Sequence, residues 1–171
     1  MPTDPQQRYI ALEGALRSGD LETARTCFEP EAGFPNVRDP LTWTPLLELA
    51  ISWSPLATIE QLLALGASVN YEAADGYPAV YAAIDSDRPD RIPLAQLVLS
   101  HGADVNQRGV KGYTPLHLAV AQKDAAAMEL LLAHGADTTL KTQVDDLGPI
   151  EEAELLGNPE GAAMLRRLLD R

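Results

Sequence analysis

Few of the residues that could do chemistry in this chain of 171 residues lie close together in sequence. It has three histidines, His101, His117 and His134, and a single cysteine, Cys27. A zinc site needs several converging nitrogen or sulfur ligands, and the cysteine is far from every histidine in sequence. We therefore expect no metal site. Cys27 cannot form an internal disulfide, and its apolar helical surroundings predict a buried structural thiol.

Acidic side chains occur in groups that could suggest acid–base catalysis or calcium binding. Two pairs, Asp145-Asp146 and Glu151-Glu152, are adjacent, and three aspartates fall within residues 85–90. Adjacent carboxylates on turns or helix starts are expected to be solvated, not tuned as a catalytic couple. The 85–90 stretch lacks the glycine and the distant glutamate of an EF-hand loop, so calcium binding is not expected.

The segment Gly109-Val110-Lys111-Gly112 has part of the composition of a phosphate-binding loop, but no serine or threonine follows at the right spacing. The sequence has no Gly-x-Ser-x-Gly nucleophile elbow and no paired cysteine and histidine motif. We expect a protein that is not an enzyme and that carries no cofactor. A site assembled from distant parts of the chain is the alternative that sequence leaves open.

The charge balance narrows the classes of partner. There are 25 acidic and 13 basic side chains, which gives a formal net charge of -12. An acidic surface repels nucleic acid backbones and anionic membranes, and it attracts a basic protein. The N-terminal stretch lacks the basic and apolar regions of a secretory signal, and no apolar run is long enough to cross a bilayer. We expect a cytoplasmic protein, and the acidity alone could also serve solubility.

The elements around the candidate residues are helical hairpins. Thr114 can cap a helix, and Pro115 suits the first helical position, where no backbone donor is needed. Leu116 lies on the apolar face of this helix. A second apolar run, 128–132, predicts a second helix, and Gly135 can adopt the left-handed conformation that ends it.

This hairpin pattern recurs along the chain. Its closing segment returns at 62–70 and 97–106, and its opening segment returns at 44–47 and, in weakened form, at 76–83. The glycines at 66, 102 and 135 are separated by 36 and 33 residues. The run Gly112-Tyr113-Thr114-Pro115-Leu116-His117-Leu118-Ala119 resembles the ankyrin repeat, which has a period of about 33 residues.

The resemblance implies an all-α ankyrin-repeat solenoid with β-hairpin-like loops between stacked helix pairs. It implies a single domain, 1–171, with repeats at about 5–36, 37–70, 71–106, 107–140 and 141–171, of which the first and last are divergent capping units. His117 is the motif histidine, expected to bond to the cap threonine. The segment 85–93 departs from the pattern and is predicted to be an enlarged surface loop between the helices of the third repeat.

The same resemblance implies a non-catalytic scaffold that binds a partner protein through hairpin tips and the concave helix face. Large aromatic side chains dominate the energetics of such interfaces, and motif phase places three of them one repeat apart. The predicted partner-binding residues are Trp43, Tyr71, Asp75, Tyr77, Tyr81, Arg108, Lys111 and Tyr113. Alternatively, these tyrosines pack only on their own hairpins.

The expected partner is a protein of basic charge, bound by a monomer. A second hypothesis is an acidic inhibitor or immunity-type protein that blocks a basic enzyme or toxin, because charge would attract such a target. An enzyme or a small-ligand-binding protein is a third alternative, with the least support from the residues.

Overall fold

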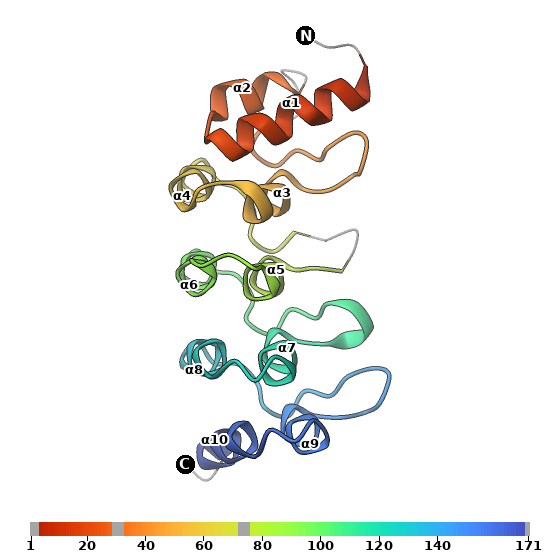
Figure 1. Ribbon diagram of the computed structural model, residues 1–171, viewed down its shortest axis with the longest axis vertical. Coiled ribbons are helices and arrows are strands. Elements are labelled where there is room, and N and C mark those ends of the chain that lie inside the picture. The colour runs from red at the N-terminus through yellow and green to blue at the C-terminus, as the bar shows by residue number, and fades with distance from the viewer. Residues whose placement is uncertain (1–3, 29–32, 72–75, 170–171) are drawn as a thin grey trace.

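Pairs of helices stack along one axis in the computed structural model, which describes residues 4–28, 33–71 and 76–169 (Figure 1). Over these residues the chain forms ten α-helices and one short 3-10 helix, η1. The pairs are α1 (Pro5–Ser18) with α2 (Leu21–Thr26), α3 (Leu46–Trp53) with α4 (Leu56–Ala64), α5 (Ala79–Asp85) with α6 (Arg91–Ser100), α7 (Pro115–Ala121) with α8 (Ala125–Ala133), and α9 (Pro149–Leu155) with α10 (Pro159–Leu169). The predicted all-α solenoid is confirmed, and each predicted repeat range contains one pair.

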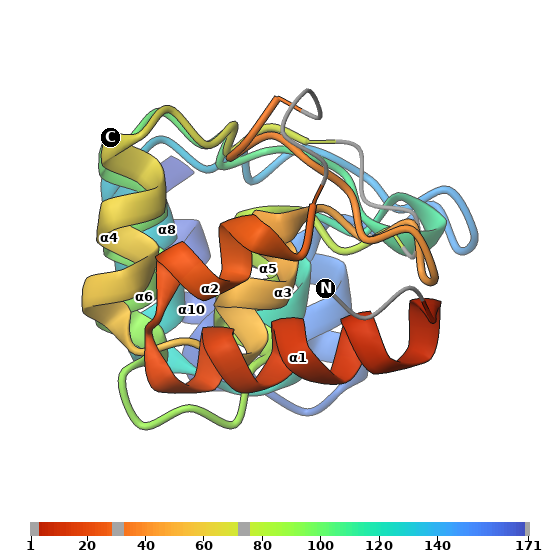
Figure 2. The ribbon, with the colours of Figure 1, turned by 90° about the horizontal axis from the view of Figure 1, so that it is seen from above.

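The stack has an inner layer and an outer layer. Helices α1, α3, α5, α7 and α9 pack in succession in the inner layer, and α6 packs on α8 in the outer layer. The long loops between pairs all extend to the same side of the stack (Figures 1 and 2). In the described residues these loops contain no β-strand, only one isolated bridge between Arg38 and Pro45. Backbone bonds close them like hairpins, such as Gly109 N–H to the Tyr113 carbonyl at 2.7 Å and Asp39 N–H to the Thr44 carbonyl at 2.9 Å.

The hydrophobic core runs along the stack instead of gathering at one centre. Small and branched side chains fill the space between successive pairs, because no pair encloses its own apolar face. Cys27 is buried in this core, as predicted. The large side chains that are almost fully enclosed are Leu12, Leu16, Leu46, Ile51, Ile59, Leu62, Ile84, Leu94, Leu116, Met128, Leu131 and Leu165.

Hydrogen bonds at the start of α7 fix the tautomer of the motif histidine, His117. The backbone N–H of Thr114 donates to Nδ1 of His117, and the Thr114 hydroxyl lies 2.8 Å from the same nitrogen. Nδ1 therefore accepts, so the ring proton is on Nε2, which donates to the Leu147 carbonyl at 3.2 Å. Burial lowers the pKa of His117, which favours this neutral ring. The predicted contact with the cap threonine is confirmed, and the ring also reaches the next repeat.

Three asparagines connect successive repeats at the opposite end of the hairpins. In each case the side-chain amide donates to the carbonyl of the glycine that follows the next outer helix, and its oxygen accepts from the backbone N–H two residues later. For Asn70 these partners are the Gly102 carbonyl at 2.9 Å and the Asp104 N–H at 2.8 Å. Asn36 and Asn106 make the same pair of bonds. We refer to the three residues as the asparagine ladder.

The predicted loop 85–93 is shorter than expected. Asp85 is the last residue of α5, and α6 begins at Arg91, so the connection is 86–90. Pro93 was assigned to the loop because proline interrupts helices, but it lies in the first turn of α6. There the missing backbone N–H removes no intrahelical bond. The predicted loop boundaries were therefore wrong at both ends, because Asp85 belongs to α5 and residues 91–93 belong to α6.

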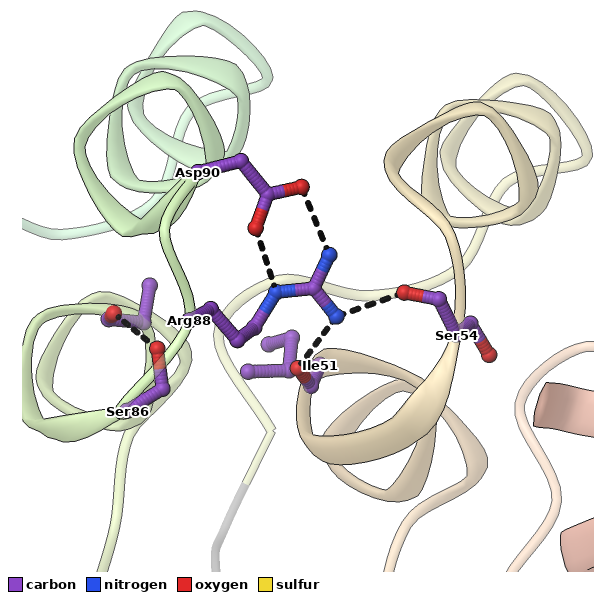
Figure 3. Close-up of polar contacts among 6 residues, drawn as sticks. Ile51, Ser54, Ser86, Arg88 and Asp90 are labelled. Atoms are coloured by element: carbon purple, nitrogen blue, oxygen red, sulfur yellow. Dashed lines mark hydrogen bonds and ion pairs between the residues drawn. The ribbon is translucent and has the colours of Figure 1, made fainter.

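Arg88 fastens this loop to the preceding repeat (Figure 3). Its guanidinium donates two bonds to Asp90, each at 2.8 Å. A third nitrogen donates to the carbonyls of Ile51, at 3.3 Å, and Ser54, at 2.5 Å, where α3 ends. Helix ends have carbonyls without intrahelical partners, and Arg88 supplies the donors. The two bonds from Arg88 to the Asp90 carboxylate hold the pKa of Asp90 below its usual range.

Replacing Leu116 by alanine should reduce the free energy of unfolding by about 2–5 kcal/mol, because its side chain is fully buried between repeats. Chemical denaturation of the purified variant measures the loss. Leu155→Ala is the matched control, since that leucine is 73% exposed and should change stability little. Equal stability of the two variants would contradict the assigned packing.

Arg88→Met keeps the apolar stem of the side chain and removes its five donors. We expect a loss of about 1–3 kcal/mol in unfolding free energy, because the carbonyls at the end of α3 lose their partner and Asp90 loses its counter-charge. Lys141→Met, which removes an exposed ion pair with Asp146, is the control and should cost at most about 1 kcal/mol. The two variants can be compared in the same urea titration.

Candidate functional site

Four of the predicted binding residues line one cavity on the side of the hairpin loops. Tyr77, Tyr81, Lys111 and Tyr113 surround a space of about 290 Å³, which we call the tyrosine pocket. Tyr77 precedes α5, Tyr81 lies on α5, and the other two belong to the η1 loop before α7. Val110, also of the η1 loop, and Val144 and Asp145 of the hairpin before α9 complete the walls.

Ring contacts and short loop bonds hold the tyrosine pocket in shape. The rings of Tyr77 and Tyr81 pack edge to face with centroids 5.2 Å apart. Tyr113 packs on His117 at 5.6 Å. The tips are also bonded to one another, because Val110 N–H donates to the Gly76 carbonyl and Gln143 N–H donates to the Lys111 carbonyl. Three successive hairpins therefore build one rigid wall.

Glu152, on α9, lies against this wall and is only 6% exposed. The Tyr113 hydroxyl donates a hydrogen bond to its carboxyl, while Oε2 has no hydrogen-bond partner among the described residues. Burial raises the pKa of Glu152 to about 7, and the nearby charge of Asp145 acts in the same direction. Burial also raises the pKa of Tyr81 to about 12, with Asp85 and Glu152 adding to the effect.

The expectation that both residues of the Glu151-Glu152 pair are solvated was wrong for Glu152. Glu151 is exposed, but the next residue turns inward. Pro149, Glu152 and Ala153 are buried on one face of α9, at the i, i+3, i+4 spacing of a helix. That spacing was present in the sequence and could have identified Glu152 as a buried acid.

A second cavity adjoins the tyrosine pocket and is strongly acidic. Tyr77 lines both, and the second space of about 550 Å³ also contacts Glu48, Asp85 and Asp87. Arg88 lies at its edge, but its guanidinium is bonded to Asp90 and to the end of α3. We call this cavity the acidic hollow. Its other lining residues are Ser52, Ala82 and Ser86.

Trp43 lies in an earlier loop than the tyrosines, the one that precedes α3. The long loops extend to one side of the stack (Figure 1). The Trp43 side chain is 66% exposed and it does not line either cavity. The backbone has a φ of 61°, and its N–H donates to the Asp39 carbonyl at 2.7 Å. A left-handed tryptophan backbone is unusual and is maintained by this loop. The indole is thus presented to solvent by a constrained turn.

Three predicted binding residues behave differently. Tyr71 is only 8% exposed and its hydroxyl donates to the Tyr77 carbonyl, so it contributes packing and not exposed surface, contrary to expectation. Arg108 donates to the carbonyls of Gly112 and Lys141 and joins two hairpins. Asp75 lies outside the residues that the structure describes.

In residues 4–28, 33–71 and 76–169, no cluster of three or more histidine, cysteine, aspartate or glutamate side chains could hold a metal ion. Over the same ranges no helix is long and apolar enough to cross a membrane. His101 and His134 each bond through Nδ1 to a carbonyl of their own helix, Leu97 and Leu130, both at 2.9 Å. These two histidines therefore cap the C-terminal ends of α6 and α8.

Comparisons with known proteins agree with this architecture. A family model described as "Ankyrin repeats (3 copies)" matches residues 58–142. The chain is 35% identical over 114 residues to an ankyrin repeat-containing protein of Treponema pallidum (strain Nichols), which covers 67% of this chain and 38% of that protein. It is 38% identical over 77 residues to ankyrin repeat and SOCS box protein 6 of Homo sapiens, covering 44% and 18%. Mouse Rabankyrin-5 is 33% identical over 135 residues, covering 78% and 11%. The matched regions span less than two fifths of these relatives.

Glu152→Gln should stabilise the protein at alkaline pH. Because the folded-state pKa is raised, the parent chain loses stability as pH rises from the ordinary glutamate value, 4.5, through about 7. The glutamine side chain still accepts the hydrogen bond from Tyr113. Because it does not ionise, the variant does not lose stability at this position as pH rises. We expect a gain of about 1–2 kcal/mol at pH 8, allowing for solvent screening, and almost none at pH 5.

Denaturation of both proteins across this pH range provides the measurement. The lowered pKa of His117 gives the opposite pH dependence, but it is common to both chains and cancels in the difference. Glu151→Gln removes an exposed carboxyl from the same helix and serves as the control. A stability difference that does not change with pH would show that the Glu152 carboxyl is not held in a raised-pKa state.

Proposed function

Because the chain belongs to the ankyrin repeat family, whose repeats are protein–protein interaction modules, we propose that it is a non-catalytic scaffold for a basic partner protein. The partner binds along the face that carries the hairpin loops and the inner helices. The observation that supports this best is the juxtaposition of the tyrosine pocket and the acidic hollow, which meet at Tyr77.

The composition of this face matches what strong interfaces use. Tyrosine and tryptophan give large contact areas at low conformational cost, and both occur here. Trp43, 66% exposed on a constrained turn, offers an anchor that needs little ordering on binding. A tryptophan so exposed is costly to keep without a use, because apolar surface is left in water.

Charge supports the choice of a basic partner. The chain has 25 acidic and 13 basic side chains, and the acidic hollow concentrates Glu48, Asp85 and Asp87 in one place. A basic surface would be drawn toward this face and oriented before contact, which raises the rate of association at low salt.

The same charge favours a second candidate, an acidic inhibitor or immunity-type protein that blocks a basic enzyme or toxin. Both functions use the same face, so they differ in the consequence of binding and not in its chemistry. Assay of the captured partner's activity with and without this protein separates them. Loss of activity on stoichiometric addition supports the inhibitor, and retained activity supports the scaffold.

Trp43→Ala should weaken binding to a partner recovered by affinity purification by about tenfold or more, as expected for an exposed aromatic anchor. Titration calorimetry on the purified pair gives the affinity. Leu65→Ala, a 57% exposed leucine beside the outer helix α4, is the matched control and should leave affinity unchanged. Association should also weaken as salt is raised, since charged surfaces are screened. Affinity unaffected by Trp43→Ala and by salt would contradict the proposed face and the basic character of the partner.

A further inference from the structure

Resting on the proposed scaffold function, we propose that the tyrosine pocket receives one cationic side chain, a lysine or arginine, from the partner. The cation would sit among the rings of Tyr77, Tyr81 and Tyr113 and close to the Glu152 carboxyl. The inference deepens the proposed function, because it assigns one cavity to one kind of partner residue.

The size of the tyrosine pocket fits a single side chain. Pockets for drug-sized ligands range from about 300 to 1,000 Å³, and this cavity of about 290 Å³ lies at or below the lower limit. Its walls suit an alkyl chain that ends in a cation. Val110 and Val144 supply apolar surface, and tyrosine rings attract cations through their electron-rich faces.

Among the described residues, no salt bridge involves Asp145, which lines the pocket, or Glu152, which contacts the lining residue Tyr113. Oε2 of Glu152 is buried and has no hydrogen-bond partner in the part of the chain that the structure describes. A buried carboxylate without a counter-charge is unfavourable, and its pKa is raised to about 7 accordingly. Asp145 lines the pocket as well, and Asp85 is close enough to Tyr81 to influence its hydroxyl. An arriving ammonium or guanidinium would supply the missing charge.

The cations already nearby do not fill this role. Lys111 lines the pocket but is exposed to solvent, and Arg108 donates to the carbonyls of Gly112 and Lys141. His117 on α7 is buried with a lowered pKa and stays neutral near pH 7. The other titratable groups near Glu152 in the described residues are acidic side chains and tyrosines, on α5, on the η1 loop, on the hairpin before α9 and on α9 itself: Asp85, Tyr81, Tyr113, Asp145 and Glu151.

Proton release should accompany binding. A cation beside Glu152 favours the ionised carboxyl, so the pKa of Glu152 falls when the pocket is occupied. Binding should therefore be stronger at pH 8 than at pH 5.5, where Glu152 is protonated and must give up its proton to pair with the guest.

The test uses small probes on the whole protein. Tyrosine ring signals and the Glu152 side-chain carboxyl are followed by NMR during titration with N-acetyl-lysine methylamide, N-acetyl-arginine methylamide or the neutral N-acetyl-norleucine methylamide. We expect one or both cationic probes to shift the signals of Tyr77, Tyr81 and Tyr113, with a Kd of roughly 1–20 mM for ligands of this size. The norleucine probe should bind at least about fivefold more weakly.

Two variants sharpen the result. Glu152→Gln should weaken the cationic probes by about fivefold or more, and it should abolish the preference for pH 8. Asp146→Asn removes an exposed carboxylate outside the pocket and should leave probe binding as in the parent chain. Preference for lysine or for arginine identifies the cation and supports the proposal in either case. Equal binding of norleucine, or no ring shifts with any probe up to about 50 mM, would overturn it.

The two proposals fail in different ways. If the probes do not enter the pocket while a partner still binds through Trp43, the cation site is rejected and the scaffold function stands. If the probes bind as expected but no partner protein uses this face, the scaffold function is rejected and the pocket remains a cation site.

Discussion

Polar groups at the ends of helices and turns need partners, and in this protein many of the partners come from the neighbouring repeat. The asparagine ladder supplies both a donor and an acceptor at each step, so each closing turn is completed by the repeat before it. His117 does the same near the hairpins by reaching the Leu147 carbonyl. A repeat on its own would leave these groups unpaired as well as exposing its apolar face. Stacking therefore satisfies hydrogen bonding and hydrophobic burial through one geometry.

The proposed binding surface depends on the same geometry. No single repeat contains the tyrosine pocket, because its walls come from the hairpins before α5, α7 and α9 and from α5 itself. The bonds between neighbouring tips fix the separation of those walls. A repeat protein can thus change its recognition chemistry by changing tip residues, while the buried leucines and the asparagine ladder keep the spacing constant.

Sequence was sufficient for the features that follow from short-range rules. The cap at Thr114, the buried Leu116 and the helix-ending glycines depend on local backbone chemistry and helical spacing, and they recur in phase. Residues whose environment is set by another repeat were harder to predict from the sequence. Tyr71 was placed on the surface by its position in the motif, but packing from adjacent hairpins buries it. The role of Arg88 could not be read from the sequence, because its carbonyl partners are more than thirty residues away. Glu152 was predicted to be solvated for a different reason. Its helical spacing with Pro149 and Ala153 indicated a buried position, but its pairing with Glu151 was taken as the sign of an exposed acidic stretch.

The loop that carries Arg88 has a consequence for how the molecule comes apart. In a simple stack each unit is coupled to its immediate neighbours, so melting can begin at either end and advance one unit at a time. Here Arg88 reaches back to α3, and Arg91, three residues later, pairs with Asp124 at the start of α8. These two arginines strengthen the contacts of the third helix pair with its immediate neighbours, the second and the fourth. Tyr77, Tyr81 and Tyr113 belong to the third and fourth repeats, whereas Val144 and Asp145 precede the last helix pair. Fraying of that last pair would therefore open one wall of the tyrosine pocket while the three tyrosines stay in place.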